Sequence, residues 1–332
     1  MKKIGLTTTI PIEVILAKDY TPVDLNNLFI TDKKYLEYID FAENDGFPKN
    51  TCAWIKGMYG ACIFNNIKDI VGVVEGDCSN TKSLIEVLSQ KGVTVYPFSF
   101  PHSHSLKDLT QEIDKFIKLF NTNIADVENV RIRLGEVREL AKKIDRLTYI
   151  QSSKATGFEN HLYQLSTSDF NSNFEKYKNI LQNKIIEISQ RSPSNKKIRL
   201  GFIGVPPIHC DIYDFVENLN AKFIYNEVQR EFAFPRWKNS KDIYSQYLDY
   251  TYPYNINFRL SEIKKQIEER NIHALIHYTQ AFCYKGIDDI VIRKNLDIPI
   301  LSIEGDKLNK LDARTKLRLE AFLDMLSDTI TS

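Results

Sequence analysis

The chain has 332 residues, with 44 basic and 43 acidic side chains, a net charge of +1 and 43% hydrophobic residues. This apolar content, with only 13 glycines and 11 prolines, excludes a disordered, collagen-like or low-complexity chain. The balanced charge gives no general electrostatic reason to expect nucleic acid or an anionic membrane as the main partner, and no apolar run approaches the ~18 residues of a membrane span. We expect a globular protein of about two domains.

The five cysteines, at positions 52, 62, 78, 210 and 283, are odd in number and scattered along the chain. That pattern does not indicate a disulfide framework. The apolar stretch after Met1 to Lys3 is short and meets Glu13, too soon for the core of a signal peptide. We therefore expect a cytoplasmic protein whose thiols are buried hydrophobes, nucleophiles or metal ligands.

Short β-rich runs alternate with helical patterns in the first third of the chain, which is typical of a parallel α/β architecture. The predicted strands are Lys3 to Thr8, Thr21 to Leu25, Asp69 to Val74 and Val93 to Phe98. The predicted helices open at Pro11, run from Thr31 as N-cap to about Glu43, follow Cys52, and run from about Thr81 to Gln90 with a stop at Gly92.

The same layout recurs after residue 196, with strands predicted at Ile198 to Val205, Lys222 to Tyr225, Ala274 to Tyr278 and Ile298 to Ile303. Residues 106 to 191 have helical spacing of apolar residues almost throughout. We expect two four-stranded parallel sheets joined by a helical segment. The expected organisation is an N-terminal α/β domain over 1–105, a helical segment over 106–195, a C-terminal α/β domain over 196–310, and a helix over 311–332 that packs back on the body.

Ligands bind beyond the carboxyl ends of strands in open parallel sheets, because loops and helix N-termini converge there. The chemically distinctive residues that follow predicted strands are Cys78, His102 and His104 in the first half, and Cys210, Glu227, Cys283, Glu304 and Asp306 in the second. If the two domains face each other, both sheets direct these residues toward one cleft.

Cysteines at such positions are candidate thiolate ligands, and soft thiolates favour iron-sulfur clusters or zinc. No CxxC pair is present, which excludes a zinc ribbon or a bacterial ferredoxin spacing. The alternative is that each cysteine is a small buried hydrophobe. Cys52 and Cys62 are ten residues apart and fall on different helix faces, so one of them is expected to pack in the core.

Other motifs are weaker or absent. Gly201 and Gly204 lack the third glycine of a dinucleotide fingerprint, and the chain contains no GxxxxGK[ST], GxSxG or HExxH segment. His102 and His104 are candidates to contact an anionic ligand or relay protons, with an exposed loop pair of no role as the alternative.

Several stretches resemble the 2-hydroxyacyl-CoA dehydratase family, which also includes the benzoyl-CoA reductase subunits and the double-cubane cluster proteins. They are KIGLTTTIPIEVILAKDYTPVDLNN, CAWIKGMYG, VVEGDCSNT, GVPPIHCDIYDFVE, YNEVQREFAFP, YTYPYNINFRLSEI and HYTQAFCYKGIDD with the later IPILSIEGD and RTKLRLEAF. The resemblance runs in order over nearly the whole chain. It implies two Rossmann-like α/β domains with an iron-sulfur cluster held in the cleft between them.

Family members bind a 4Fe-4S cluster through three cysteines, which match Cys52, Cys78 and Cys283 here, with Cys210 as a further candidate. The resemblance implies an oxygen-sensitive enzyme of anaerobic metabolism, a lyase or oxidoreductase. In relatives an ATP-hydrolysing activator supplies low-potential electrons, and a 2-hydroxyl group is lost reductively through a ketyl radical. The absence of a P-loop fits such a division of labour. A double cubane is less favoured, because that group uses six cysteines and this chain has five.

We therefore expect a cluster protein that forms a homodimer, or a heterodimer with a related subunit, and acts on an acyl-CoA or another small molecule. On position alone, His102, His104, Glu227, Gln229 and Arg230 are expected to line the cleft. The alternative for Glu227 and Arg230 is that they cap and pair at a helix start. Two other functions stay open: an electron-transfer or cluster-carrying accessory protein, and a non-redox binding protein with buried thiols.

Overall fold

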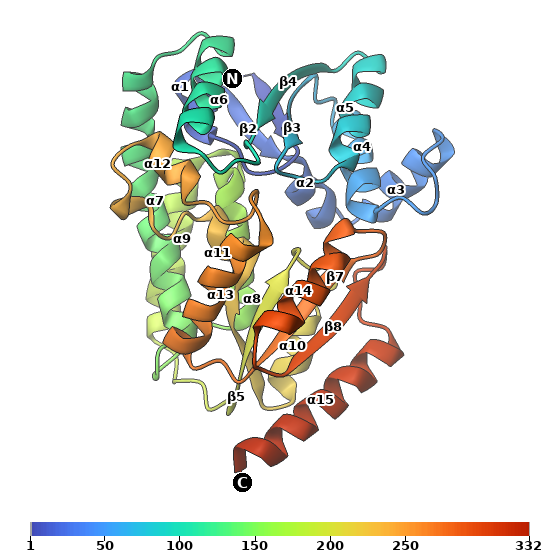
Figure 1. The fold of residues 1–332 in the computed structure, drawn as a ribbon, viewed down its shortest axis with the longest axis vertical. Helices are drawn as coiled ribbons and strands as arrows, with labels where there is room; N and C mark the ends of the chain where they lie inside the picture. The colour runs from blue at the N-terminus through green and yellow to red at the C-terminus, as the bar shows by residue number, and fades with distance from the viewer. Residues whose placement is uncertain (1, 332) are drawn as a thin grey trace. The chain divides into compact units, whose positions relative to one another are not determined.

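The computed structural model describes residues 2–331, which form two compact units, each assembled from three stretches of the chain. Unit 1 comprises Met1–Glu139, Ser166–Asn179 and Phe234–Asn255, and unit 2 comprises Leu140–Leu165, Ile180–Ala233 and Ile256–Ser332. Each unit contains one four-stranded sheet (Figure 1). Over the described residues, every helix is too short or too polar to cross a membrane.

The sheet of unit 1 has the strand order β2-β1-β3-β4, and all its pairings are parallel. Its strands are β1 (Lys3–Leu6), β2 (Thr21–Asp24), β3 (Asp69–Glu75) and β4 (Thr94–Ser99). Parallel strands are covered on both faces and therefore form nearly continuous apolar runs, as in the buried Ile70 to Val73 segment of β3.

Parallel strands can be joined only by crossovers, and helices provide them in unit 1. The crossovers are α1 (Ile12–Ala17), then α2 (Leu25–Thr31), α3 (Tyr35–Asn44) and α4 (Ala53–Phe64), and finally α5 (Asn80–Gln90). The other helices of unit 1 are α6 (Leu106–Leu119), the first part of α7 (Ile124–Tyr149), the short helices η1 (Ser166–Ser168) and η2 (Phe170–Ser172), the start of α9 (Phe174–Ser189), η3 (Trp237–Asn239) and α12 (Ile243–Leu248). Residues of α2 to α5 form one apolar cluster with β3. The outer helices α4 and α5 lie together beside the strands (Figure 1).

The sheet of unit 2 has the order β6-β5-β7-β8 and is also wholly parallel. Its strands are β5 (Ile198–Gly204), β6 (Ala221–Asn226), β7 (Ala274–Gln280) and β8 (Ile300–Gly305). Its helices are α8 (Gly157–Leu165), α10 (Ile212–Asn218), α11 (Glu227–Phe232), α13 (Ile256–Arg270), η4 (Tyr284–Ile287), α14 (Asp288–Asn295) and α15 (Ala313–Thr331). Residues of α10 and α15 share one apolar cluster with the sheet, and residues of α13 and α14 share another. The predicted fold class, α/β with two four-stranded parallel sheets, is confirmed.

One predicted helix start is wrong. Thr31 was expected to cap a helix running to about Glu43, but it is the last residue of α2. Helix α2 begins at Leu25, directly after β2. The Asp24 side chain caps this helix by accepting a hydrogen bond from the Asn26 backbone N–H. A separate helix, α3, begins at Tyr35 without a side-chain cap.

Two buried carboxyl groups lie side by side in unit 1. The backbone N–H of Asp24 donates to Asp169 Oδ2 at 2.9 Å, and the two side chains are 4% and 5% exposed. Burial, and then the neighbouring Asp24, raises the pKa of Asp169 to about 7, and burial raises the pKa of Asp24 as well. Amide and hydroxyl groups of Asn26, Asn27 and Ser168 face the pair.

This pair predicts that stability falls as pH rises. The unfolded chain releases the Asp169 proton near pH 4, whereas the folded protein retains it up to about pH 7. The folded state therefore binds more protons between these values and loses on the order of 4 kcal/mol of stability across them. An asparagine side chain in place of Asp24 would keep the cap without the second charge, so Asp24→Asn is expected to be more stable than wild type at pH 8 in denaturant unfolding.

Asp242→Asn is the matched control for this prediction, because Asp242 also caps a helix of unit 1 but has a lowered pKa, from hydrogen bonds to Ser245 that outweigh its burial. It should bring no gain at pH 8. A loss of stability in Asp24→Asn that is equal at pH 5 and pH 8 would contradict the shared-proton account.

Candidate functional site

Cys52 begins helix α4 at the carboxyl-end edge of the sheet of unit 1. It is the N-cap residue, with the non-helical backbone angles φ −50° and ψ 134°, and is 6% exposed. Its carbonyl oxygen accepts the backbone N–H groups of Ile55 and Lys56, which closes the first turn of the helix. Because α4 leads directly into β3, it runs back along the sheet, and its N-terminus lies where ligands of such sheets bind.

Cys78 lies in the turn between β3 and α5, at the same edge of the sheet. The register of β3 shifts between Val73 and Glu75, and Gly76 then takes φ +86°, a conformation that favours glycine. A side chain on Gly76 would also meet Phe100 Cβ at 2.6 Å. The Cys78 carbonyl accepts a hydrogen bond from the Thr81 N–H in the first turn of α5. Cys78 is half-buried and lies at the N-terminal end of this helix.

Cys52 and Cys78 belong to one apolar environment. Both pack against the cluster formed by α2 to α5 and β3, Cys52 as a buried member and Cys78 at its margin. Two thiols at adjacent helix starts, in largely dry surroundings, are suited to bind a soft metal as thiolates. The structure thus brings two of the three predicted cysteines to one edge of one sheet.

Cys283 occupies the equivalent position in unit 2. It follows β7 and is the N-cap of η4, with its N–H donating to the Gln280 carbonyl at 2.9 Å. Burial raises the pKa of its thiol, while the backbone N–H and the ammonium group of Lys285 oppose that rise by favouring the thiolate. Within residues 2–331, no three His, Cys, Asp or Glu side chains are close enough together to form a complete metal site.

The other two cysteines, Cys62 in unit 1 and Cys210 in unit 2, have thiols whose pKa is raised by burial. Cys62 is fully buried in α4 and donates to the Ile67 carbonyl, and burial raises its pKa to about 12. Burial, with a smaller effect from Asp211, raises the pKa of Cys210 to about 11. Both environments favour the neutral thiol, which is the weaker metal ligand.

The two histidines predicted for the cleft lie in the loop after β4. His102 is exposed, and its backbone N–H donates to Glu75 Oε1 at 3.0 Å. His104 has φ +50°; its Nε2 lies 2.8 Å from the Leu248 carbonyl and its ring lies 4.2 Å from the ring of Tyr254. The structure therefore places both near the carboxyl end of β4, with His104 held by its neighbours.

Glu227, Gln229 and Arg230 are on α11, directly after β6, and each is held inside unit 2. Glu227 is 2% exposed and accepts two hydrogen bonds from the Arg259 guanidinium and one from the Gly204 N–H. Gln229 donates from Nε2 to His161 Nδ1 at 3.0 Å.

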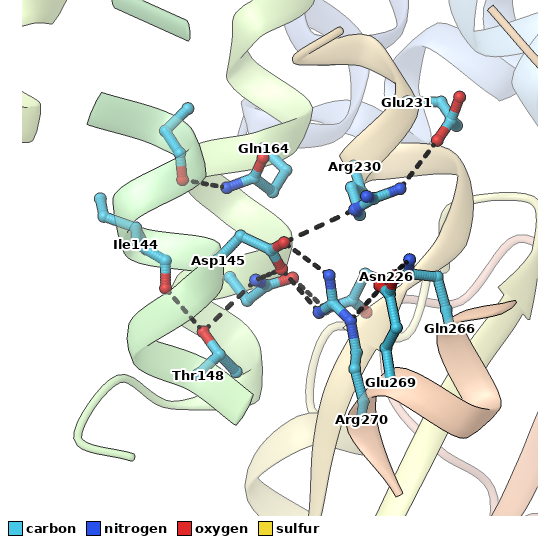
Figure 2. A network of polar contacts seen from close by, with 12 residues as sticks. Ile144, Asp145, Thr148, Gln164, Asn226, Arg230, Glu231, Gln266, Glu269 and Arg270 are labelled. Atoms are coloured by element: carbon cyan, nitrogen blue, oxygen red, sulfur yellow. Dashed lines mark hydrogen bonds and ion pairs between the residues drawn. The ribbon is translucent and has the colours of Figure 1, made fainter. Parts of the chain in front are cut away.

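Arg230 belongs to a buried charge network around Asp145 (Figure 2). Its guanidinium pairs with Glu231 and Glu262 and lies 3.5 Å from Asp145, which also receives two hydrogen bonds from Arg270. Although burial alone would raise the pKa of Asp145, the nearby Arg270 and Arg230 hold it below its usual range. These contacts join α7, α11 and α13 within unit 2.

The Asp145 network yields a stability prediction. Asp145→Asn leaves two buried guanidinium groups with less compensating charge, so it should lower the free energy of unfolding by about 3–5 kcal/mol. Arg133→Gln removes an ion pair with Glu175 in which both side chains are about 60% exposed, and should change stability little. Equal stability of the two variants in denaturant unfolding would refute the importance of the network.

Two residues of the CAWIKGMYG segment were not singled out from the sequence. The Trp54 Nε1–H is buried and has no hydrogen-bond acceptor among the described residues. Lys56 is 3% exposed and its ammonium group is bound by Glu43 and the Lys49 carbonyl. The only available signal was their position two and four residues after Cys52.

Comparison with known proteins found a family model that matches nearly the whole chain. A family model described as 2-hydroxyglutaryl-CoA dehydratase, D-component, matches residues 7–326. No curated protein matches the chain. The family match confirms the resemblance inferred from the sequence motifs, and the matched region includes all five cysteines.

Proposed function

The chain belongs to the 2-hydroxyglutaryl-CoA dehydratase D-component family, and we propose that it binds a 4Fe-4S cluster through Cys52, Cys78 and Cys283. The cluster would serve low-potential, one-electron reductive chemistry, a dehydration or a reduction, on an acyl-CoA or another small molecule. The observation that carries the proposal is the placement of all three cysteines at helix starts: Cys78 and Cys283 follow strands β3 and β7, and Cys52 is the N-cap of α4, the helix that leads into β3.

The local chemistry of the three positions supports this ligand set. Thiolates are the usual ligands of iron-sulfur clusters. Cys52 and Cys78 pack on one apolar cluster, and the rise that burial causes in the pKa of Cys283 is partly opposed by the N–H and ammonium groups of Lys285. The buried Trp54 N–H near Cys52 in sequence is a donor that still lacks an acceptor, and sulfur atoms of a bound cluster would provide one.

When bound, a cluster with three protein thiolates would supply a low-potential electron and one iron without a protein ligand. The chain's own contribution is to exclude water and to stabilise negative charge. The apolar cluster around Cys52 limits access of solvent to its thiolate. The N-termini of α4 and α5 carry partial positive charge that favours negative charge at Cys52 and Cys78.

The proposal includes two protein partners. The chain contains no P-loop, so we propose that electrons come from a separate ATP-dependent activator component. We also propose a dimer, either of this chain or with a related subunit. With five cysteines in total, a single chain lacks the six thiolates of a double-cubane cluster, so the single 4Fe-4S cluster is favoured.

The ligand assignment predicts which cysteines are needed. After anaerobic reconstitution, wild type should hold about four irons and four sulfides per chain, measured by chemical analysis and electron paramagnetic resonance. Cys52→Ala, Cys78→Ala and Cys283→Ala should each lose most of this content. Cys62→Ala removes a thiol of the same helix whose environment keeps it protonated, and it should retain the cluster.

Other outcomes would change or end the proposal. Equal retention in all four variants would refute the ligand set, and near eight irons per chain would favour the double cubane. No iron after careful reconstitution would contradict cluster binding altogether.

Turnover separates an enzyme from an electron carrier. The reconstituted protein, reduced through an ATP-dependent activator, is expected to convert a 2-hydroxyacyl-CoA to the unsaturated acyl-CoA, followed by chromatography of the thioesters. Reduction of the cluster without turnover of any acyl-CoA or small reducible molecule would instead support the carrier function.

A further inference from the structure

A seven-residue segment leads from helix α3 into Cys52. We call Asp45 to Thr51 the entry segment; it contains Gly46 at φ +109° and Pro48, and it has no regular secondary structure beyond turns. Backbone N–H groups of Asp45, Gly46 and Phe47 donate to carbonyls at the end of α3, whereas further along the segment the backbone bond is the one from Thr51 N–H to the Pro48 carbonyl. Side chains must therefore fix much of its conformation.

Lys56 is the buried side chain that fastens this segment to helix α4. Its ammonium group lies 2.7 Å from Glu43 Oε1 at the end of α3 and 3.1 Å from the Lys49 carbonyl in the entry segment. Its side chain is 4% exposed. Its own backbone N–H donates to the Cys52 carbonyl, so one residue joins the cysteine, the entry segment and α3.

Neighbouring residues of the same helix support this arrangement. Tyr59 donates its hydroxyl hydrogen to Asp45 at the start of the entry segment, and its ring packs 4.8 Å from Phe47. Gly60 allows α3 to approach α4 closely, because a Cβ there would lie 2.5 Å from the Tyr38 backbone. The last residues of CAWIKGMYG thus hold α3 and the entry segment against the helix that Cys52 begins.

We infer that Lys56 is a positioning residue that holds Cys52 in the place required of a metal ligand. Moving an ammonium group out of water costs free energy. If Lys56 only filled space, an apolar residue of similar size would fill it without that cost. The carbonyl of Lys49 and the carboxylate of Glu43 are contacts that only a cation with several N–H donors can satisfy together. This inference rests on the proposed cluster-binding function for its purpose, although the anchoring of Cys52 can be measured without a cluster.

The first experiment measures anchoring in the cluster-free protein. Thiol alkylation under anaerobic conditions, followed by peptide mapping, reports how often each cysteine becomes accessible. In Lys56→Met, the labelling rate of Cys52 should rise roughly tenfold to a hundredfold, as expected for loss of hydrogen bonds to a charged group. Cys62, fully buried ten residues further along α4, should keep its wild-type rate.

Lys91→Met is the matched control. Lys91 also pairs with the entry segment, at 2.7 Å from Asp45, but its side chain is 42% exposed. Its replacement should leave Cys52 labelling near the wild-type rate. Wild-type labelling of Cys52 in Lys56→Met would overturn the inference. If Lys56→Met fails to fold, Glu43→Gln, which removes the charge of the carboxylate that Lys56 binds, tests the same contact with a smaller expected increase.

The second experiment uses the reconstituted protein. Lys56→Met should lose iron to a chelator at least about tenfold faster than wild type and should show an altered electron paramagnetic resonance line shape, whereas Lys91→Met should match wild type. A wild-type line shape and rate in Lys56→Met would reject the positioning role. Absence of any cluster in wild type would instead reject the proposed function, while the labelling result would still decide whether Lys56 anchors Cys52.

Discussion

The parallel pairing of strands is the constraint on which the rest of this structure depends. Parallel strands require a crossover after each strand, and here the crossovers are helices that return along the sheet. The carboxyl ends of the strands and the N-termini of the following helices therefore meet at one edge of each sheet. Cys52 and Cys283 are N-cap residues and Cys78 directly precedes the N-cap of α5, so the topology places all three at positions where ligands of such sheets bind.

Buried ion pairs fix helices and segments near these sheet edges. In unit 2, Glu227 with Arg259, and Asp145 with Arg270, fix the helices that follow β6 and precede β7. In unit 1, Lys56 with Glu43 ties the entry segment to α4. Buried ion pairs add little net stability compared with apolar packing, but breaking one is strongly destabilising, so they tend to fix one particular arrangement. The apolar clusters hold each sheet together, and in unit 1 the Lys56–Glu43 ion pair also fixes the segment that leads into Cys52.

Much of the fold could be predicted from local pattern. All eight strands lie within two residues of their predicted limits, because buried parallel strands form distinct apolar runs. The helix start at Thr31 was wrong because a threonine is a common cap, whereas Asp24 already caps α2 directly after β2. The positions of the cysteines at strand ends followed from topology. The burial of Lys56 and the partners of Glu227 and Arg230 could not be predicted, because those partners come from other elements of the fold.

The central claim is that thiolates from both sheets hold one iron-sulfur cluster. The most direct measurement is a crystal structure of the anaerobically reconstituted protein with anomalous diffraction data collected at the iron absorption edge. The account predicts one group of iron peaks bonded to the sulfur atoms of Cys52, Cys78 and Cys283. Iron bonded to other residues, or an iron-containing crystal in which any of these three sulfur atoms lies away from the metal, would contradict it.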